Sequence, residues 1–241
     1  MPSLMQTETI AGGTASTELE NGTLTLLHGA LEKHGSAIAQ ASSFSVEDVV
    51  VTDLLTRIRS DVRVFAIDTG RLPEETLLCA DAVAARFHIQ IEWFFPQREA
   101  VEKLIREQGT HSFRESLEKR HECCGIRKVE PLSRALAGLT AWITGLRRDQ
   151  NVSRTQLNET EPDLLHGGIL KYNPLAAWTA EDVLAYAKSR QLPFHRLYGQ
   201  GYRSIGCAPC TRAVQPGEDE RAGRWWWESS EHKECGLHAR H

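Results

Sequence analysis

Short apolar segments alternate with helical segments along most of the chain, and this alternation restricts the possible folds more than any other feature. Strands are expected at residues 36–42, 62–67, 89–95, 139–144 and 169–173. Helices are expected at residues 24–33, 46–58, 73–87, 97–107, 127–137 and 179–188. Strands that alternate with helices form parallel sheets that are covered on both faces. We therefore predict an α/β fold: a parallel, twisted sheet with helices on both faces.

Composition narrows the function classes. The net charge of −4, with His neutral, argues against a general nucleic-acid binder, which needs a basic excess. No apolar run approaches 18 residues, so we expect no membrane span. The polar residues 1–20 lack the basic start and apolar middle of a signal peptide, and we expect a flexible arm there and a cytoplasmic protein.

Three loops follow predicted strands, where open α/β sheets bind their ligands. Residues 42–47 contain Ser43, Phe44 and Ser45 just before a helix, whose free N–H groups favour anions. These serines could equally be ordinary helix caps. Residues 68–71 form the second loop, and residues 145–150 place the adjacent cations Arg147 and Arg148 after a strand. Together the loops favour a nucleotide or another anion.

Four of the six cysteines form two pairs, Cys123-Cys124 and Cys207-Ala-Pro-Cys210. Four thiolates suit either zinc or an iron–sulfur cluster. A cubane offers several irons, so that adjacent cysteines can reach different corners, and we therefore favour a [4Fe–4S] cluster over zinc. The alternative is that some are buried thiols. Cys79 lies among apolar residues of a helix and is expected to pack in the core.

Cys235 lies apart from the other cysteines, near the C-terminus, and Lys233 and His238 could stabilise its thiolate. This arrangement suits a nucleophile, although a lone cysteine is often incidental. Cations surround this chemistry: Lys128 follows the first cysteine pair, and Arg221 and Arg224 could form an oxyanion pocket with His238. They could also be solvated charges, and the run of three tryptophans at 225–227 has no assigned role.

The chain resembles the assimilatory adenylyl-sulfate reductases, within the adenylyl-sulfate and phosphoadenylyl-sulfate reductase family. The motifs appear in family order over about residues 35–241. They are Ser43-Phe44-Ser45 with Glu47-Asp48, Asp68-Thr69-Gly70-Arg71-Leu72, Cys123-Cys124 with Ile126–Leu132, Thr144-Gly145-Leu146-Arg147-Arg148-Asp149-Gln150, Cys207-x-x-Cys210 and Glu234-Cys235-Gly236-Leu237-His238.

The resemblance implies a fold like that of the adenine-nucleotide α-hydrolases, with a modified pyrophosphate (PP) loop at 42–48. It implies that both cysteine pairs hold a [4Fe–4S] cluster and that Cys235 attacks adenosine 5′-phosphosulfate. AMP would leave, and thioredoxin or a glutaredoxin-like dithiol would release sulfite from the S-sulfocysteine. The implied substrate-binding residues are Ser43, Phe44, Ser45, Lys128, Arg147, Arg148, Arg154, Arg221, Arg224 and His238.

We thus expect an α/β nucleotide-binding domain at residues 21–206 and a mobile C-terminal segment at 207–241 that carries Cys207, Cys210 and the catalytic tail. Mobility would let Cys235 close over the substrate and later meet the reductant. A homo-oligomer is plausible from the resemblance. The alternatives are a phosphoadenylyl-sulfate reductase, a PP-loop tRNA sulfur transferase, which usually has a Gly-Gly loop, and a metal-holding nucleotide sensor, which would not need Cys235.

Overall fold

The computed structural model describes residues 11–150 and 154–229, which form a six-stranded sheet in the order β3-β2-β1-β4-β6-β5. The strands are β1 (Ile38–Ala41), β2 (Val64–Ile67), β3 (Ile91–Phe94), β4 (Ala141–Ile143), β5 (Thr160–Asp163) and β6 (Ile169–Tyr172). Every neighbouring pair is parallel except β5 and β6, which are antiparallel. The predicted α/β fold is confirmed, with one antiparallel strand added at the edge.

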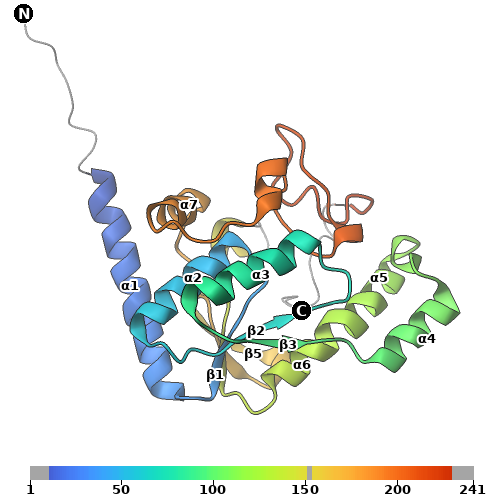
Figure 1. The fold of residues 1–241 in the computed structure, drawn as a ribbon, viewed down its shortest axis with the longest axis horizontal. Coiled ribbons are helices and arrows are strands. Elements are labelled where there is room, and N and C mark those ends of the chain that lie inside the picture. The colour runs from blue at the N-terminus through green and yellow to red at the C-terminus, as the bar shows by residue number, and fades with distance from the viewer. Residues whose placement is uncertain (1–10, 151–153, 230–241) are drawn as a thin grey trace, which may run out of the picture.

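Helices cover both faces of this sheet (Figure 1). They are α1 (Ala11–His34), α2 (Val46–Ile58), α3 (Glu74–Phe87), α4 (Arg98–Gln108), α5 (Leu117–Cys124), α6 (Glu130–Leu136) and α7 (Ala180–Ser189). Alternate strand residues face opposite layers. Ile143 joins the core beneath α1, α2, α3 and α7, whereas Trp142 packs with Leu132 and Leu136 of α6.

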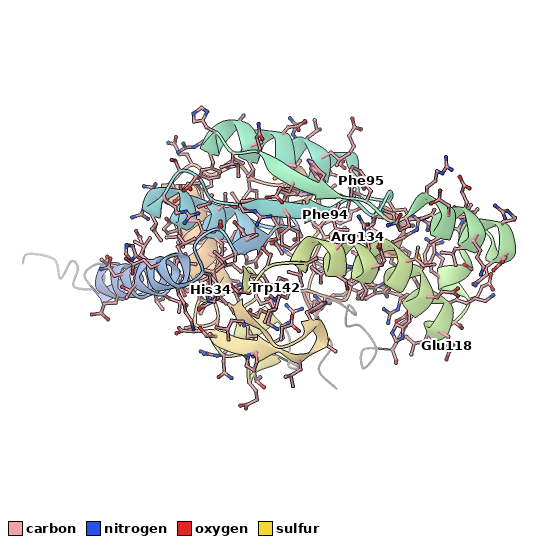
Figure 2. All side chains as sticks on the ribbon, turned by 90° about the horizontal axis from the view of Figure 1, so that it is seen from below. His34, Phe94, Phe95, Glu118, Arg134 and Trp142 are labelled. Carbon is pink, nitrogen blue, oxygen red and sulfur yellow. The ribbon has the colours of Figure 1, made fainter. Side chains whose placement is uncertain are left out.

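The helix α6 contacts the end of β3 through a side-chain hydrogen bond. Figure 2 shows Arg134 of α6 beside Phe94 and Phe95, and its guanidinium donates a hydrogen bond to the carbonyl of Phe95. It also pairs with Glu130 one turn earlier on α6, with 2.7 Å between Nε and Oε1. These contacts set the position of α6 and of the cysteine-bearing segment that precedes it.

The strand β5 was not predicted because its sequence, Thr-Glu-Pro-Asp, has no apolar pattern. Pro162 lacks an N–H group and is tolerated in a sheet only at an edge. β5 occupies such an edge, and its pairing with β6 is reinforced by an ion pair between Lys171 and Glu161, with 2.8 Å between Nζ and Oε1. This pairing accounts for a strand without a core face of its own.

One helix begins earlier than predicted, and another is preceded by helical residues that were not predicted. Residues 11–20, expected to be a flexible arm, belong to α1, where Leu19 packs against the core and Glu20 pairs with Arg57 at 2.7 Å. The helix predicted at 127–137 is preceded by α5, and a π-helical segment, Gly125–Val129, joins α5 to α6. Such π segments are rare and frequently lie at functional sites.

The chain after residue 206, expected to be mobile, is anchored to the body over its described part. Thr211, Arg224 and Trp225 are buried, and an isolated β-bridge joins Thr211 to Arg224. Within the described residues no helix is both long and apolar enough to cross a membrane.

Candidate active site

A cavity of about 260 Å³ lies at the carboxyl ends of β1, β2 and β4. The three predicted loops meet there, as expected where parallel strands end at one edge. Of the residues predicted to bind substrate, eight line it: Ser43, Phe44, Ser45, Lys128, Arg147, Arg154, Arg221 and Arg224. The cavity therefore unites cations from four separate parts of the sequence.

One region of this cavity is apolar. Its wall there includes Phe65 and Ile67 of β2, Leu132 of α6 and Trp142 of β4. The cationic side chains, in contrast, include Lys128 of the segment Gly125–Val129 and, from the C-terminal segment, Arg221 and Arg224. An elongated ligand with an aromatic part and an anionic part matches this division.

The loop between β1 and α2 is closed by a carboxylate of its own. The N–H and the hydroxyl of Ser43 both donate to Oδ2 of Asp48, at 2.6 and 2.7 Å. Ser45 caps α2 by accepting from the N–H of Asp48 at 3.4 Å. Phe44 has a positive φ of 60°, which is uncommon for a bulky residue, and its ring is buried in the core. Phe44 therefore offers a ligand mainly its backbone.

Asp48 is buried at this loop, and burial raises its pKa to about 6, although the hydrogen bonds from Ser43 act in the opposite direction. Gly145 makes the close packing possible. A Cβ atom at position 145 would lie 2.5 Å from Oδ1 and 3.0 Å from the backbone N of Asp48. The loop after β4 thus rests directly on the N-terminus of α2.

The adjacent arginines of that loop have different surroundings. Arg147 is buried and pairs with Glu47, with 3.0 Å between Nη2 and Oε1, and also contacts Asp149. Arg148 donates from Nε to the carbonyl of Leu157 at 2.7 Å and does not line the cavity. Arg147 therefore lines the cavity as the ion-pair partner of Glu47, whereas Arg148 lies outside the cavity.

Several cavity residues were missed by the sequence analysis. Tyr198 accepts a hydrogen bond from the N–H of Val46 at the start of α2, at 3.2 Å. Arg203 and Glu220 also line the cavity, from loops without a motif. The side chain of Glu220 is partly withdrawn from solvent, and this burial raises its pKa. The nearby Glu47 and Asp149 raise the pKa further, whereas Arg147 and Arg203 act in the opposite direction. The sequence held only one signal for these missed residues, which is that they lie close to Cys207 or Arg221 along the chain.

The four paired cysteines line a second, smaller cavity. Cys123 and Cys124 end α5, and Cys207 and Cys210 come from the C-terminal segment. Burial raises the pKa of Cys123 and of Cys210, the latter to about 12, and the neighbouring Cys207 raises both further. The pairs are therefore close in space although more than eighty residues separate them.

Cys207 differs from Cys123 and Cys210 in the direction of its pKa shift. Burial alone would raise its pKa, but the charges of Lys128, Arg224 and Arg127, together with a hydrogen bond to Thr69, lower it below its ordinary value. The hydroxyl of Thr69 lies 3.2 Å from the sulfur. Lys128 and Cys207 line both cavities, so the cysteine cluster borders the nucleotide-sized cavity directly.

The chemistry around the cysteine cavity fits an anionic group. Arg127 and Trp225 line it, and each has a buried nitrogen, Nε and Nε1 respectively, without a hydrogen-bond partner among the described residues. Thiolate and sulfide sulfurs accept such hydrogen bonds. In the described part of the chain, no three His, Cys, Asp or Glu side chains are placed to hold a single metal ion.

Two predicted residues, Cys235 and His238, lie outside the described residues. The described chain ends at Ser229, a few residues beyond Arg224, which lines the cavity. Cys235 is therefore separated by only a short segment from a residue of the cavity.

Comparisons with known proteins find a family and relatives with similar sequences. The family model of the phosphoadenosine phosphosulfate reductase domain matches residues 37–213. The adenosine 5′-phosphosulfate reductase of Burkholderia cepacia is 51% identical, over 86% of this chain and 82% of that protein. The protein of the same name from Neisseria meningitidis serogroup B is 46% identical, over 98% of this chain and 97% of its own length.

Solved structures share the fold at lower identity. The phosphoadenylyl-sulfate reductase of Candida auris matches with a TM-score of 0.69 and 24% identity, over 88% of this chain and all of that chain. The FMN adenylyltransferase of Candida glabrata matches with a TM-score of 0.61 and 13% identity, over 95% of this chain and 79% of that chain. Both likenesses concern the fold alone.

Proposed function

Because the chain belongs to the phosphoadenosine phosphosulfate reductase family, we propose that it reduces adenosine 5′-phosphosulfate to sulfite and AMP, as part of assimilatory sulfate reduction. The observation that carries this proposal is the shared wall of the two cavities, where Lys128 and Cys207 border both. The names of the two relatives described above support adenosine 5′-phosphosulfate as the substrate.

The cavity suits this nucleotide at both of its ends. The apolar wall with Phe65, Ile67 and Trp142 accommodates adenine, and the guanidinium groups of Arg221 and Arg224 hold the phosphosulfate. Lys128 adds a third cation beside the cysteines. These cations offset the charge that accumulates when a thiolate approaches an anion, and they stabilise the departing phosphate.

Cys235 is the proposed catalytic residue, which rests on the motif Glu234–His238. Its thiolate attacks the sulfur atom of the substrate. A sulfur–sulfur bond forms, the bond between that sulfur and the bridging oxygen breaks, and AMP leaves with the electron pair. A thiolate of thioredoxin or a similar dithiol then attacks Sγ of Cys235, a mixed disulfide forms, and sulfite leaves with the electron pair of the broken sulfur–sulfur bond. The second thiol of the reductant attacks this mixed disulfide, which releases the Cys235 thiolate and closes the reductant's own disulfide. The dithiol supplies both electrons.

Cys123, Cys124, Cys207 and Cys210 are the proposed ligands of a [4Fe–4S] cluster. Two buried N–H donors and several cations around one cavity of four thiols support this assignment. The cluster would supply structure and electrostatic stabilisation rather than electrons. Ligation would also link α5 to the C-terminal segment that carries Arg221 and Arg224, and thus assemble the substrate cavity.

The test is anaerobic sulfite release from adenosine 5′-phosphosulfate with reduced thioredoxin, together with iron and acid-labile sulfide analysis. We expect turnover and about four iron and four sulfide per chain. Without reductant, mass spectrometry should find a sulfonate group on Cys235.

Cys235→Ser should bind the nucleotide and produce no sulfite. Cys79→Ser is the matched control, because this buried thiol lies in the core and outside both cavities. Nucleotide binding without sulfite release by the wild-type protein would refute the proposal.

A further inference from the structure

Trp225 has a strained backbone at a fully buried position. Its φ is 40°, and only 1% of the residue is exposed. A bulky side chain with a positive φ is an outlier that persists only where the surrounding structure holds it. The backbone N–H of Trp225 donates a hydrogen bond to the carbonyl of Cys210 at 3.1 Å, which links the strained residue to a cysteine of the second pair.

Two guanidinium groups lie over the indole ring of Trp225. The Cζ atom of Arg120 is 4.5 Å from the ring centroid, and that of Arg224 is 4.6 Å from it. Both distances are within the range of cation–π attraction, and both arginines are buried, which strengthens the attraction. Arg120 is neutralised by Glu228, with 2.7 Å between Nε and Oε1.

Arg224, in contrast, is not neutralised by a carboxylate, although its charge also acts on the thiol of Cys207. Its Nη1 donates to the carbonyl of Ile205 at 3.1 Å, and no carboxylate among the described residues forms an ion pair with it. Gly206 packs on the same guanidinium, so closely that a Cβ atom there would lie 2.4 Å from Nη2. The side chain is therefore held by a ring, a glycine and a carbonyl, all of them uncharged.

We propose that Arg120 and Trp225 position the Arg224 guanidinium for the anionic end of the bound nucleotide. This inference rests on the proposed function, because it takes Arg224 as a ligand for phosphosulfate. Arg120 lines the cysteine cavity and does not line the nucleotide cavity, so it acts on the substrate through the Trp225 ring. Arg120 also belongs to α5, the helix that ends in Cys123 and Cys124. The stack thus links the cysteine-bearing helix to a substrate cation.

The test compares binding of adenosine 5′-phosphosulfate with binding of adenosine, which lacks the anionic group. Both dissociation constants are measured by calorimetry on the full chain with Cys235→Ser, which prevents turnover. Trp225→Leu removes the aromatic face, and we expect affinity for adenosine 5′-phosphosulfate to fall about tenfold while affinity for adenosine changes less than about twofold. Trp225→Phe keeps an aromatic face and should restore binding to within about threefold of the parent.

A second variant keeps the test decisive if Trp225→Leu loses iron. Arg120→Lys retains the charge opposite Glu228 and removes the planar group over the ring. We expect it to weaken adenosine 5′-phosphosulfate binding about threefold, with adenosine binding and iron content unchanged. Equal weakening of both ligands in each variant, or unchanged binding of adenosine 5′-phosphosulfate in both, would overturn the inference. The parent's own binding and the wild-type sulfite assay report separately on the proposed function.

Discussion

Gly145 packs so closely on Asp48 that a Cβ atom at position 145 would lie 2.5 Å from Oδ1 of the aspartate. The contact joins the loop after β4 to the first turn of α2, and both line the nucleotide cavity. The two loops are therefore positioned by backbone proximity, in addition to the ion pair between Arg147 and Glu47.

Gly145→Ala is expected to force these loops apart. Overpacking in a buried contact costs about 1–3 kcal/mol, and the displaced Asp48 would also weaken AMP binding. Thermal unfolding and AMP titration measure the two effects. Gly22→Ala is the matched control, since position 22 of α1 is exposed with nothing within 4 Å of an added Cβ, and it should be neutral or stabilising. Wild-type behaviour of Gly145→Ala would contradict the packing argument.

Arg147→Ala should be strongly destabilising because it leaves Glu47 charged in a buried position. The expected loss is about 3–5 kcal/mol by urea denaturation. Arg63→Ala breaks an Arg–Glu pair in which both side chains are 38% exposed, and it should cost at most about 1 kcal/mol. A double variant, Arg147→Met with Glu47→Met, should recover most of the stability. Equal costs for the two arginines would show that the burial of the Glu47 pair is unimportant.

The central strands of the parallel sheet were predictable because they are buried on both faces and read as continuous apolar runs. Val64–Ile67 and Ala141–Ile143 are of this kind. Thr160–Asp163 has no such run, and its strand exists only because β6 offers it a partner. Likewise, α1 extends to residue 11 without a strong pattern, since a few contacts such as that of Leu19 suffice to hold it.

Within the site, the motifs predicted which segments meet, and the structure added how individual side chains are directed. Arg147 and Arg148 are equivalent in sequence, yet one is clamped by Glu47 and the other bonds the carbonyl of Leu157. Trp225 had no assigned role, because neither its positive φ nor its two stacked arginines leave a signature in sequence. Side-chain direction depends on tertiary contacts that residue spacing does not report.

Asp48 should give the protein a characteristic pH dependence. Burial raises its pKa from 3.8 to about 6, so between about pH 4 and pH 6 the folded state retains a proton that the unfolded state has lost. The contribution of Asp48 to stability therefore falls as the pH rises through this window, by about 3 kcal/mol for a shift of about two units.

Asp48→Asn removes this titration. We subtract the unfolding free energy of wild type from that of the variant, both measured by urea denaturation at each pH. We expect this difference to increase by about 3 kcal/mol from pH 4 to pH 7. Asp61→Asn is the control, because that side chain is 77% exposed. A difference between wild type and Asp48→Asn that stays constant over this range would mean that the pKa of Asp48 is not raised.

Glu220 should help the cavity to reject a nucleotide that carries an additional 3′-phosphate. Its carboxylate lines the cavity within electrostatic range of Glu47 and Asp149, both of which pair with Arg147, and of Arg203. The uncharged hydroxyls of a ribose tolerate neighbouring carboxylates, whereas a phosphate dianion is repelled by them.

We expect Glu220→Gln to raise kcat/KM for phosphoadenylyl sulfate about tenfold and to change kcat/KM for adenosine 5′-phosphosulfate less than about threefold. Glu99→Gln makes the same charge change at an exposed position of α4, outside the cavity, and separates a local effect from a change in net charge. An unchanged ratio of the two kcat/KM values in Glu220→Gln would exclude the carboxylate as a determinant of this selectivity.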